Sequence, residues 1–378
     1  NRMGMTVKHL LGISGGKDSA ALAIYLNQRH PEIEVEYYTC DTGKELKETY
    51  DLIDRLESAL GKPIERYQSF EEGKTAIDNP FDHFLASYGN YLPSSISRWC
   101  TKKMKLEPFE RNIGDEPTIS YVGIRGDENR EGYVSKRENI QTIFPYRKNI
   151  WSEDVIKLAL SMEKHESFTE GLKKQLDGDA LEKALSILAT PLGLTFTLKQ
   201  KMQALLDFNT KAFNHAIHEV LKTTDYPVGK LDDFPLLDND DVLVIDDIYN
   251  ILETSGVGVP AYYLPMEYKV EIDGKVETGT YSRSRSGCFF CFYQQKIEWV
   301  WLLEQHPALF EAAKKYEMDG YTWSEESLSD LEQPERVERI KAEHWKRMQR
   351  NNAKSSSNAS WKDQVLDAEG QGCTSCFV

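Results

Sequence analysis

Two groups of residues have the types and the spacing that chemistry requires. The first is Ser14-Gly-Gly-Lys-Asp-Ser19, where two glycines, a lysine and two serine hydroxyls fall within six residues. Glycines let a backbone approach an anion closely, and successive N–H groups together with a lysine neutralise phosphate charge. The second group is six cysteines, four of which form the pairs Cys288/Cys291 and Cys373/Cys376. The first group predicts phosphate binding, and the second predicts metal or redox chemistry.

The elements around the glycine-rich segment are those of an open α/β sheet. An apolar run at 8–13 predicts a buried strand, and 18–29 have the pattern of a helix. An alternating strand at 33–39 and an amphipathic helix at 45–60 follow, and a further strand fits 118–124. This alternation predicts βαβ units and a parallel twisted sheet with helices on both faces. The segment therefore joins a strand to a helix N-terminus, whose dipole favours anions, although it lacks the spacing of a Walker A loop.

The rest of the chain changes in texture after this α/β part. Helical periodicity at 153–163, 170–188 and 198–222 predicts a helical insertion, and Asp273-Gly274 predicts a hairpin turn. Helices are expected again over 293–316 and 324–350, before a polar linker at 351–360. We expect four parts: a nucleotide-binding α/β domain over 1–150, a helical insertion over 151–240, a completion of the core with the Cys-x-x-Cys site over 241–350, and a cysteine-containing tail over 351–378.

The segment at 14–19 resembles the phosphate loop of the PP-loop ATP pyrophosphatases. Further motifs, in the same order, resemble the phosphoadenosine-phosphosulfate-reductase-like branch of that class: Asp41-Thr-Gly43, Arg98-x-Cys100-Thr101, Gly123-Ile-Arg125-x-Asp127-Glu128, Gly258-Val-Pro-Ala-Tyr262-Tyr263 and Gly287-Cys288-x-x-Cys291. The resemblance implies an adenine-nucleotide α-hydrolase-like fold that binds ATP and Mg²⁺ at the carboxyl ends of its strands. Lys17, Asp18 and Arg125 are the implied catalytic residues. The implied nucleotide-binding residues are Ser14, Gly15, Gly16, Lys17, Asp18, Ser19, Asp41, Arg125, Asp127 and Glu128.

Each of the shorter motifs also has a plainer interpretation. Asp41 with its following glycine is typical of a turn or a helix N-cap, and the charged residues at 125–128 are also typical of a solvated loop. Cys40 follows a strand and is expected to be a packed core thiol. Trp151-Ser-Glu-Asp-Val155 either opens the insertion or serves as a Trp-x-x-Asp-Val element of the family.

The resemblance places Cys100, Cys288 and Cys291 in one site. Three thiolates and one more ligand suit a [4Fe–4S] cluster, which we favour, or Zn²⁺ as the alternative. Cys373 or Cys376 is the expected fourth ligand, unless the tail cysteines are incidental or form a separate sulfur-relay pair. The basic residues Arg283, Arg285 and Lys296 beside the pair could offset the negative charge of a cluster.

The chain departs from the sulfonucleotide reductases in its length and in its tail, which lacks their Glu-Cys-Gly-Leu/Ile-His segment. It looks most like the ATP-pyrophosphatase component of bacterial DNA phosphorothioation systems, which serve in antiphage defence. That resemblance implies an ATP pyrophosphatase that releases AMP and pyrophosphate while sulfur from a cysteine desulfurase enters DNA, together with other subunits of a modification complex. Thiolation of a tRNA base, reduction of an adenylyl sulfate and non-catalytic nucleotide sensing in a defence complex are the alternatives.

The net charge of −15 and the pI near 5.1 argue against a protein that coats nucleic acid along its whole surface. Two local runs are nevertheless basic: 98–111 has five basic residues against two acidic ones, and 335–354 has seven against three. Lys346, Arg347 and Arg350 in the second run either contact DNA or belong to a solvated helix face. No run of 18 or more apolar residues and no apolar leader occur, so we expect no membrane span and a cytoplasmic location.

Overall fold

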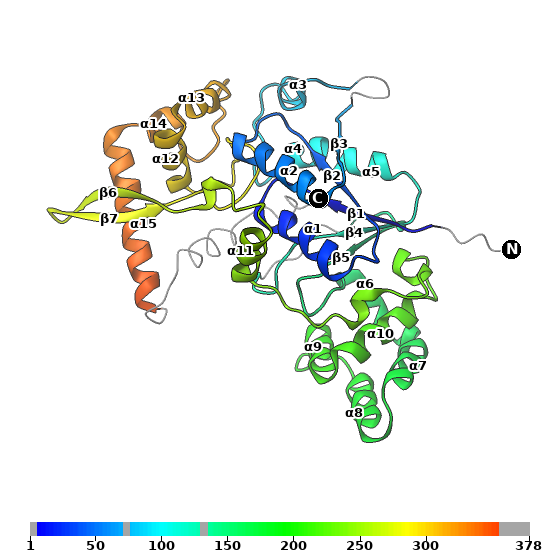
Figure 1. Cartoon of the computed structure of the whole chain (residues 1–378). Helices are drawn as coiled ribbons and strands as arrows, with labels where there is room; N and C mark the ends of the chain where they lie inside the picture. The colour runs from blue at the N-terminus through cyan, green and yellow to red at the C-terminus, as the bar shows by residue number, and fades with distance from the viewer. Residues whose placement is uncertain (1–5, 71–75, 129–134, 355–378) are drawn as a thin grey trace.

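The structure is a computed structural model that describes residues 6–70, 76–128 and 135–354. The predictions for Cys373 and Cys376, and those for the linker beyond Lys354, lie outside the described residues. Within these ranges the chain folds around one five-stranded sheet, with the helical insertion at one end and a hairpin with further helices at one side (Figure 1).

The sheet is parallel throughout, as the βαβ pattern predicts. Its strands are β1 (Lys8–Gly12), β2 (Val35–Cys40), β3 (Ile64–Tyr67), β4 (Thr118–Tyr121) and β5 (Ile140–Ile143), in the order β3-β2-β1-β4-β5. The strand order reverses between β1 and β4, and open α/β sheets bind ligands at the carboxyl edge of such a switch point. The loop at 13–16 leaves β1 at this position.

Helices cover both faces of the sheet because neighbouring residues of a strand point to opposite faces. Leu11 belongs to a large buried cluster with α1 (Lys17–Arg29) and α2 (Lys47–Leu60), whereas Leu10 packs with Phe109 of α5 (Glu107–Ile113). Helix α2 ends at Gly61, whose φ of 65° is the left-handed conformation of a helix C-terminus. The predicted fold class, an α/β sheet with helices on both faces, is confirmed.

The predicted helical insertion consists of short helices that share the core of the sheet. They are α6 (Glu153–Ala159), α7 (His165–Gln175), α8 (Gly178–Ala189), α9 (Leu198–Phe208) and α10 (Thr210–Leu221). Phe168, Leu188 and Phe213 belong to the same buried cluster as Leu11. The chain then returns through α11 (Ile245–Thr254), which packs against α1.

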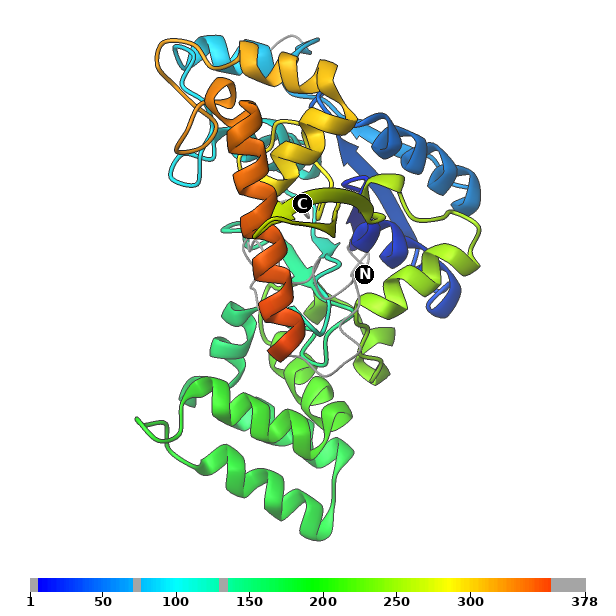
Figure 2. The same ribbon diagram turned by 90° about the vertical axis from the view of Figure 1, so that its left-hand side faces the viewer.

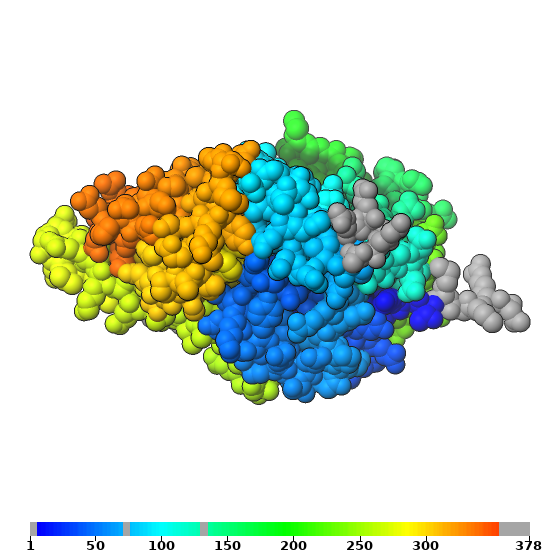
Figure 3. Space-filling view, turned by 90° about the horizontal axis from the view of Figure 1, so that it is seen from above, coloured from blue at the N-terminus to red at the C-terminus, as the bar shows by residue number. Residues whose placement is uncertain are grey.

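The C-terminal part has its own hydrophobic cluster. The hairpin β6 (Met266–Ile272) and β7 (Lys275–Tyr281) packs on the long helix α15 (Pro334–Lys354), which runs along one side of the molecule (Figure 2). Along the chain, three helices separate β7 from α15: α12 (Lys296–Gln305), α13 (Pro307–Lys315) and α14 (Leu328–Leu331). From above, this part lies against the surface formed by the first third of the chain (Figure 3).

Several predicted boundaries need correction. The hairpin turn at Asp273 and Gly274 is confirmed by their φ angles of 51° and 80°, a pair that two-residue turns require. Residues 351–354, predicted as linker, instead continue α15. Strands β3 and β5, helix α3 (Pro80–Ser87) and the helical stretch of α4 (Trp99–Thr101) with its π-helical turn (Lys102–Leu106) are additions to the prediction. In the described ranges, no helix combines the length and the apolar character needed to cross a membrane.

Candidate nucleotide and thiol site

The phosphate loop depends on two glycines that have no room for a side chain. Gly15 has a φ of +79°, and a Cβ on it would collide with Thr49 of α2. A Cβ on Gly16 would lie 2.6 Å from Ser286 Oγ and 3.0 Å from Tyr263 OH. Gly15 is therefore required by packing and by backbone conformation, and Gly16 is required by packing.

Hydroxyl groups hold the loop in place. The backbone N–H of Ser14 donates to Ser19 Oγ at 3.1 Å, and that of Gly16 donates to Ser14 Oγ at 3.2 Å. Ser286 Oγ donates to Ser14 Oγ at 3.3 Å from a segment 272 residues further along the chain. Hydroxyl groups from within the loop and from Ser286 thus give the loop a defined shape.

Two tyrosines close the loop from the other side. Tyr262 OH donates to the carbonyl of Gly15 at 3.3 Å, and the N–H of Lys17 donates to Tyr263 OH at 3.3 Å. The Nζ atom of Lys17 lies 4.7 Å from the centre of the Tyr263 ring and 3.4 Å from Asp18 Oδ2. Burial raises the pKa of Tyr262, so its hydroxyl remains a hydrogen-bond donor. The sequence placed both tyrosines in a motif but indicated no role for them.

Arg125 is fully buried among carboxylates. Its Nη1 donates to Asp18 Oδ1 at 2.7 Å, its Nε donates to Asp127 Oδ1 at 2.9 Å, and Glu128 Oε1 lies 3.3 Å from Nη1. Asp127 also accepts from the N–H of Ile245, which fixes the start of α11. The interpretation of residues 125–128 as a solvated loop is therefore wrong for Arg125, which is 0% exposed. Through Asp18, Arg125 positions the first turn of α1, and its catalytic role stays a prediction.

Asp41 forms a turn at the end of β2. Its Oδ1 accepts from the N–H of Gly43 at 2.8 Å and from Tyr50 OH at 2.9 Å. These contacts are those of a turn, which is the plainer interpretation of this motif. Its part in binding nucleotide or Mg²⁺ stays a prediction.

The side chains at the phosphate loop are of the types that bind ATP together with Mg²⁺. Mg²⁺ in nucleotide sites is bound mainly by phosphates and water with one or two carboxylates, and Asp18 stands beside the loop. Over the described ranges, no three His, Cys, Asp or Glu side chains are arranged to hold a metal ion by themselves. Mg²⁺ bound with the nucleotide would supply positive charge to the phosphates, with Asp18 as the nearby carboxylate and Lys17 adding charge from the protein.

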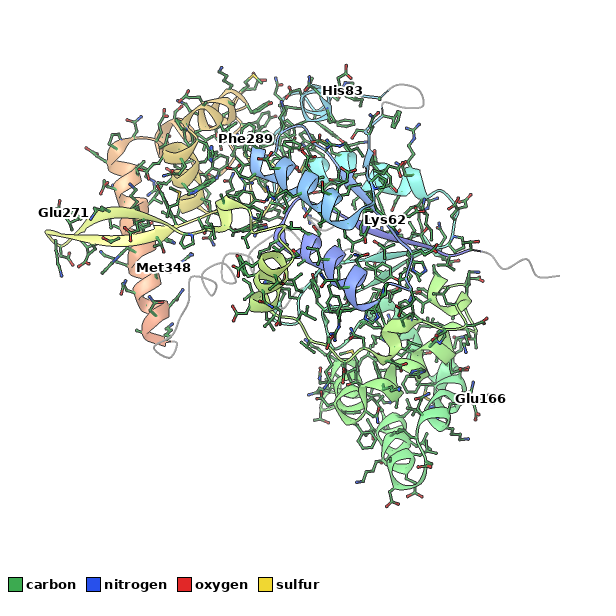
Figure 4. All side chains as sticks on the ribbon, in the orientation of Figure 1. Lys62, His83, Glu166, Glu271, Phe289 and Met348 are labelled. Carbon is green, nitrogen blue, oxygen red and sulfur yellow. The ribbon has the colours of Figure 1, made fainter. Side chains whose placement is uncertain are left out.

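The three cysteines of the implied site line one cavity. Cys100, Cys288 and Cys291 surround a space of about 50 Å³ together with Thr42 and Lys105. Thr42 Oγ1 lies 3.2 Å from Cys288 Sγ, and Glu45 forms a β-bridge with Cys288. The resemblance thus named residues that the fold brings together from two distant segments. Figure 4 shows Phe289, the neighbour of Cys288, between the sheet and the C-terminal helices, far from Glu166 in the insertion.

The described residues give no support to a metal ion or a cluster at the three cysteines, and the predicted fourth ligand lies outside them. The three cysteines do not form a metal-binding group within the described part of the chain, and burial raises the pKa of the Cys288 thiol, which favours its protonated form. The [4Fe–4S] cluster and the alternative Zn²⁺ therefore gain no support here. Lys296, expected to offset cluster charge, lies 3.6 Å from Glu326. Cys40 is buried in the core as predicted, and burial raises its pKa to about 12.

Comparison with known proteins supports the class that the fold and the loop define. Residues 8–163 match the phosphoadenosine phosphosulfate reductase domain family, so this part of the chain resembles that domain of the PP-loop class. The match includes Trp151-Ser-Glu-Asp-Val155, whereas the motifs around Tyr262 and Cys288 lie beyond it.

One curated relative is the tRNA-specific 2-thiouridylase MnmA of Hydrogenovibrio crunogenus, which is 27% identical over 146 residues. The aligned part covers 34% of this chain and 36% of that protein, so the chain spans about a third of the relative's length. No solved structure matches the chain.

Proposed function

We propose that this protein splits ATP into AMP and pyrophosphate in order to activate an acceptor oxygen for sulfur insertion, and that the acceptor is a phosphate of the DNA backbone. The observation that carries the proposal is the phosphate loop at the switch point of the sheet, with Lys17 and Ser19 on the first turn of α1. The matched family and the curated relative are both named for sulfur chemistry, which supports sulfur as the incoming atom.

The proposed chemistry has two stages. In the first, an acceptor oxygen attacks the α-phosphorus of ATP, a new O–P bond forms, and pyrophosphate leaves with the electrons of the broken bond. In the second, the terminal sulfur of a persulfide, supplied by a cysteine desulfurase, displaces AMP from the acceptor. A further thiol then attacks the remaining S–S bond, which leaves the sulfur on the acceptor and a disulfide between the two thiols.

The thiol cavity lies beside the loop that this chemistry uses. Ser286, which lines the cavity, donates to Ser14 of the phosphate loop. Cys100 and Cys291, which line the cavity, are therefore the proposed thiols for the final step. Other subunits of a modification complex would deliver DNA and persulfide.

The test of ATP cleavage is pyrophosphate release by anaerobically purified protein in the presence of a DNA duplex. Lys17→Ala should lower the rate at least about 100-fold, because its ammonium group neutralises charge on the leaving phosphates. Lys47→Ala is the matched control, since Lys47 is 85% exposed on the next helix, and it should keep the rate. Wild-type release of pyrophosphate from the Lys17→Ala protein would refute the proposal. ATP binding without release would instead favour a nucleotide-sensing subunit.

Thiolation of a tRNA base is the second candidate function. It is favoured by the 27% identity to a tRNA-specific 2-thiouridylase. Parallel reactions with tRNA and with DNA separate the two, because the true acceptor should stimulate pyrophosphate release and gain sulfur. Stimulation by tRNA alone would overturn the DNA assignment and leave ATP cleavage standing.

A further inference from the structure

Arg98 and Arg285 lie beside the ring of Tyr293, and Arg347 reaches the neighbouring residue Gln295 from another part of the chain. The Cζ atoms of Arg98 and Arg285 each lie 5.8 Å from the centre of the Tyr293 ring. Arg347 of α15 donates from Nη2 to the side chain of Gln295, two residues further on, at 3.2 Å. We refer to Arg98, Arg285 and Arg347 as the Tyr293 arginine group.

This group lies next to both halves of the candidate site. Tyr293 lines the same cavity as Cys288 and Cys291. Arg285 immediately precedes Ser286, whose hydroxyl donates to Ser14 of the phosphate loop. An anion held by the group would therefore stand beside the thiols and close to the nucleotide phosphates.

The loop that carries Arg285 is held rigidly. Arg283 is 0% exposed, and it donates from Nε to the carbonyl of Arg285 at 2.9 Å and from Nη2 to the carbonyl of Cys288 at 2.6 Å. Its Nη1 has no hydrogen-bond partner among the described residues. A buried guanidinium thus fixes the backbone between the arginine group and the cysteines, which prepares Arg285 for binding.

The chemistry of the group indicates a tetrahedral oxyanion. Guanidinium groups present paired N–H donors that match two oxygens of a phosphate, and they stack on aromatic rings while doing so. Helix α15 carries this positive charge outward: Arg347 is half-buried, whereas Lys346, Arg350 and Lys354 are exposed. Basic side chains spaced along one helix suit a polymer with regularly spaced phosphates better than a single small anion.

We propose that Arg98, Arg285 and Arg347 bind a phosphodiester group of acceptor DNA, in a subsite separate from the phosphate loop. The inference rests on the proposed function and names the residues that bring the acceptor to it. The inference gives the basic residues of 335–354 two roles. Arg347 contacts the phosphodiester at the site, and the exposed basic residues after it contact the neighbouring phosphates of the DNA.

Binding of a fluorescently labelled 20-base-pair DNA duplex, followed by anisotropy without ATP, tests the subsite. Arg285→Gln and Arg347→Gln should each weaken binding about tenfold or more, and each should lower the slope of log affinity against log salt by about 1. Arg339→Gln is the matched control, because it removes the same charge from an exposed position of the same helix, and it should stay within about twofold of wild type. Arg347→Lys keeps the charge but not the paired donors, and it should recover part of the affinity.

The outcomes separate this inference from the function on which it rests. Lys17→Ala should bind the duplex as wild type does, and Arg347→Gln should bind ATP as wild type does, which also shows that the variant is folded. Wild-type affinity for DNA in both arginine variants would overturn the subsite even if pyrophosphate release stands. Two results would overturn the assignment of the subsite to DNA. One is that the arginine variants lose affinity only for an RNA duplex of the same sequence. The other is that inorganic sulfate displaces the duplex equally from the wild-type protein and from the variants.

Discussion

Arg125 shows how one side chain orders the nucleotide end of the molecule. Its guanidinium contacts Asp18, Asp127 and Glu128 without exposure to solvent. A buried ion network contributes little net stability, because the cost of desolvating the charges offsets their attraction. Removal of one partner is nevertheless destabilising, because it leaves an unpaired charge buried.

We therefore expect Arg125→Met to lower the free energy of unfolding by about 3–5 kcal/mol and to weaken ATP binding, because Asp18 loses the contact that positions it. Urea unfolding and equilibrium binding of ATP measure the two effects. Arg66→Met is the control: Arg66 is half exposed, lies 3.8 Å from Asp41, and should contribute less than about 1 kcal/mol. Equal losses in the two variants would contradict the network.

At the same scale, the sequence indicated the residues of the site that are near one another along the chain. The loop at 14–19 and the segment at 125–128 follow strands directly, so the α/β pattern places them at one edge. Ser286 and Tyr263 were not identified as part of this site, because they reach the loop from more than 240 residues away and short polar contacts leave no pattern in sequence. The three cysteines were grouped by resemblance alone.

At the scale of elements, the attachment of α15 to the hairpin includes a titratable contact. His344 Nδ1 lies 2.7 Å from Tyr268 OH of β6, and burial, with a smaller contribution from Arg347, lowers the pKa of His344 to about 4. The histidine is therefore neutral when folded at pH 7, and its Nδ1 is hydrogen-bonded to the tyrosine hydroxyl.

This contact should make the attachment sensitive to acid. Because the folded pKa is below the unfolded value of about 6.5, its contribution is complete above pH 6.5 and is lost as pH falls toward 4. Between pH 7.5 and pH 5, wild type should lose about 2 kcal/mol relative to His344→Gln, which keeps a hydrogen-bonding side chain but cannot be protonated. Urea unfolding at both pH values measures the difference. The pKa values of His9 and His218 are lowered too, but these residues act alike in both proteins. A parallel pH dependence in the two proteins would contradict the assignment.

Elements with strong local signals were predicted well, and those that depend on partners were not. The hairpin follows from Asp273-Gly274, and α2 follows from its apolar spacing and the glycine at its end. Strands β3 and β5 have four residues each, too few to show a period, and they become strands by pairing with β2 and β4. The π-helical turn after Cys100 has no signature in sequence.

For the whole molecule, the two large hydrophobic clusters define what should unfold together. One joins the sheet to the helical insertion, and the other joins the hairpin to the C-terminal helices. The indole N–H of Trp151 donates to Asn214 Oδ1 of α10 at 2.9 Å, with both side chains fully buried. This bond links the end of the sheet region to the insertion within the first cluster. The insertion is therefore expected to unfold with the sheet.

Trp151→Phe tests this expectation. It removes the donor and leaves the Asn214 carbonyl oxygen buried without that bond, so the free energy of unfolding should fall by about 1–3 kcal/mol. Hydrogen exchange should accelerate together in β1 and α10, because local opening follows cooperative units. Trp323→Phe is the matched control, since its N–H donates to the carbonyl of Ala313 at 2.9 Å within the second cluster. It should accelerate exchange in α12–α15 instead. If Trp151→Phe accelerated exchange in α7–α10 while β1 kept its protection, the insertion would be a separate folding unit, and the shared core would not bind the two parts into one.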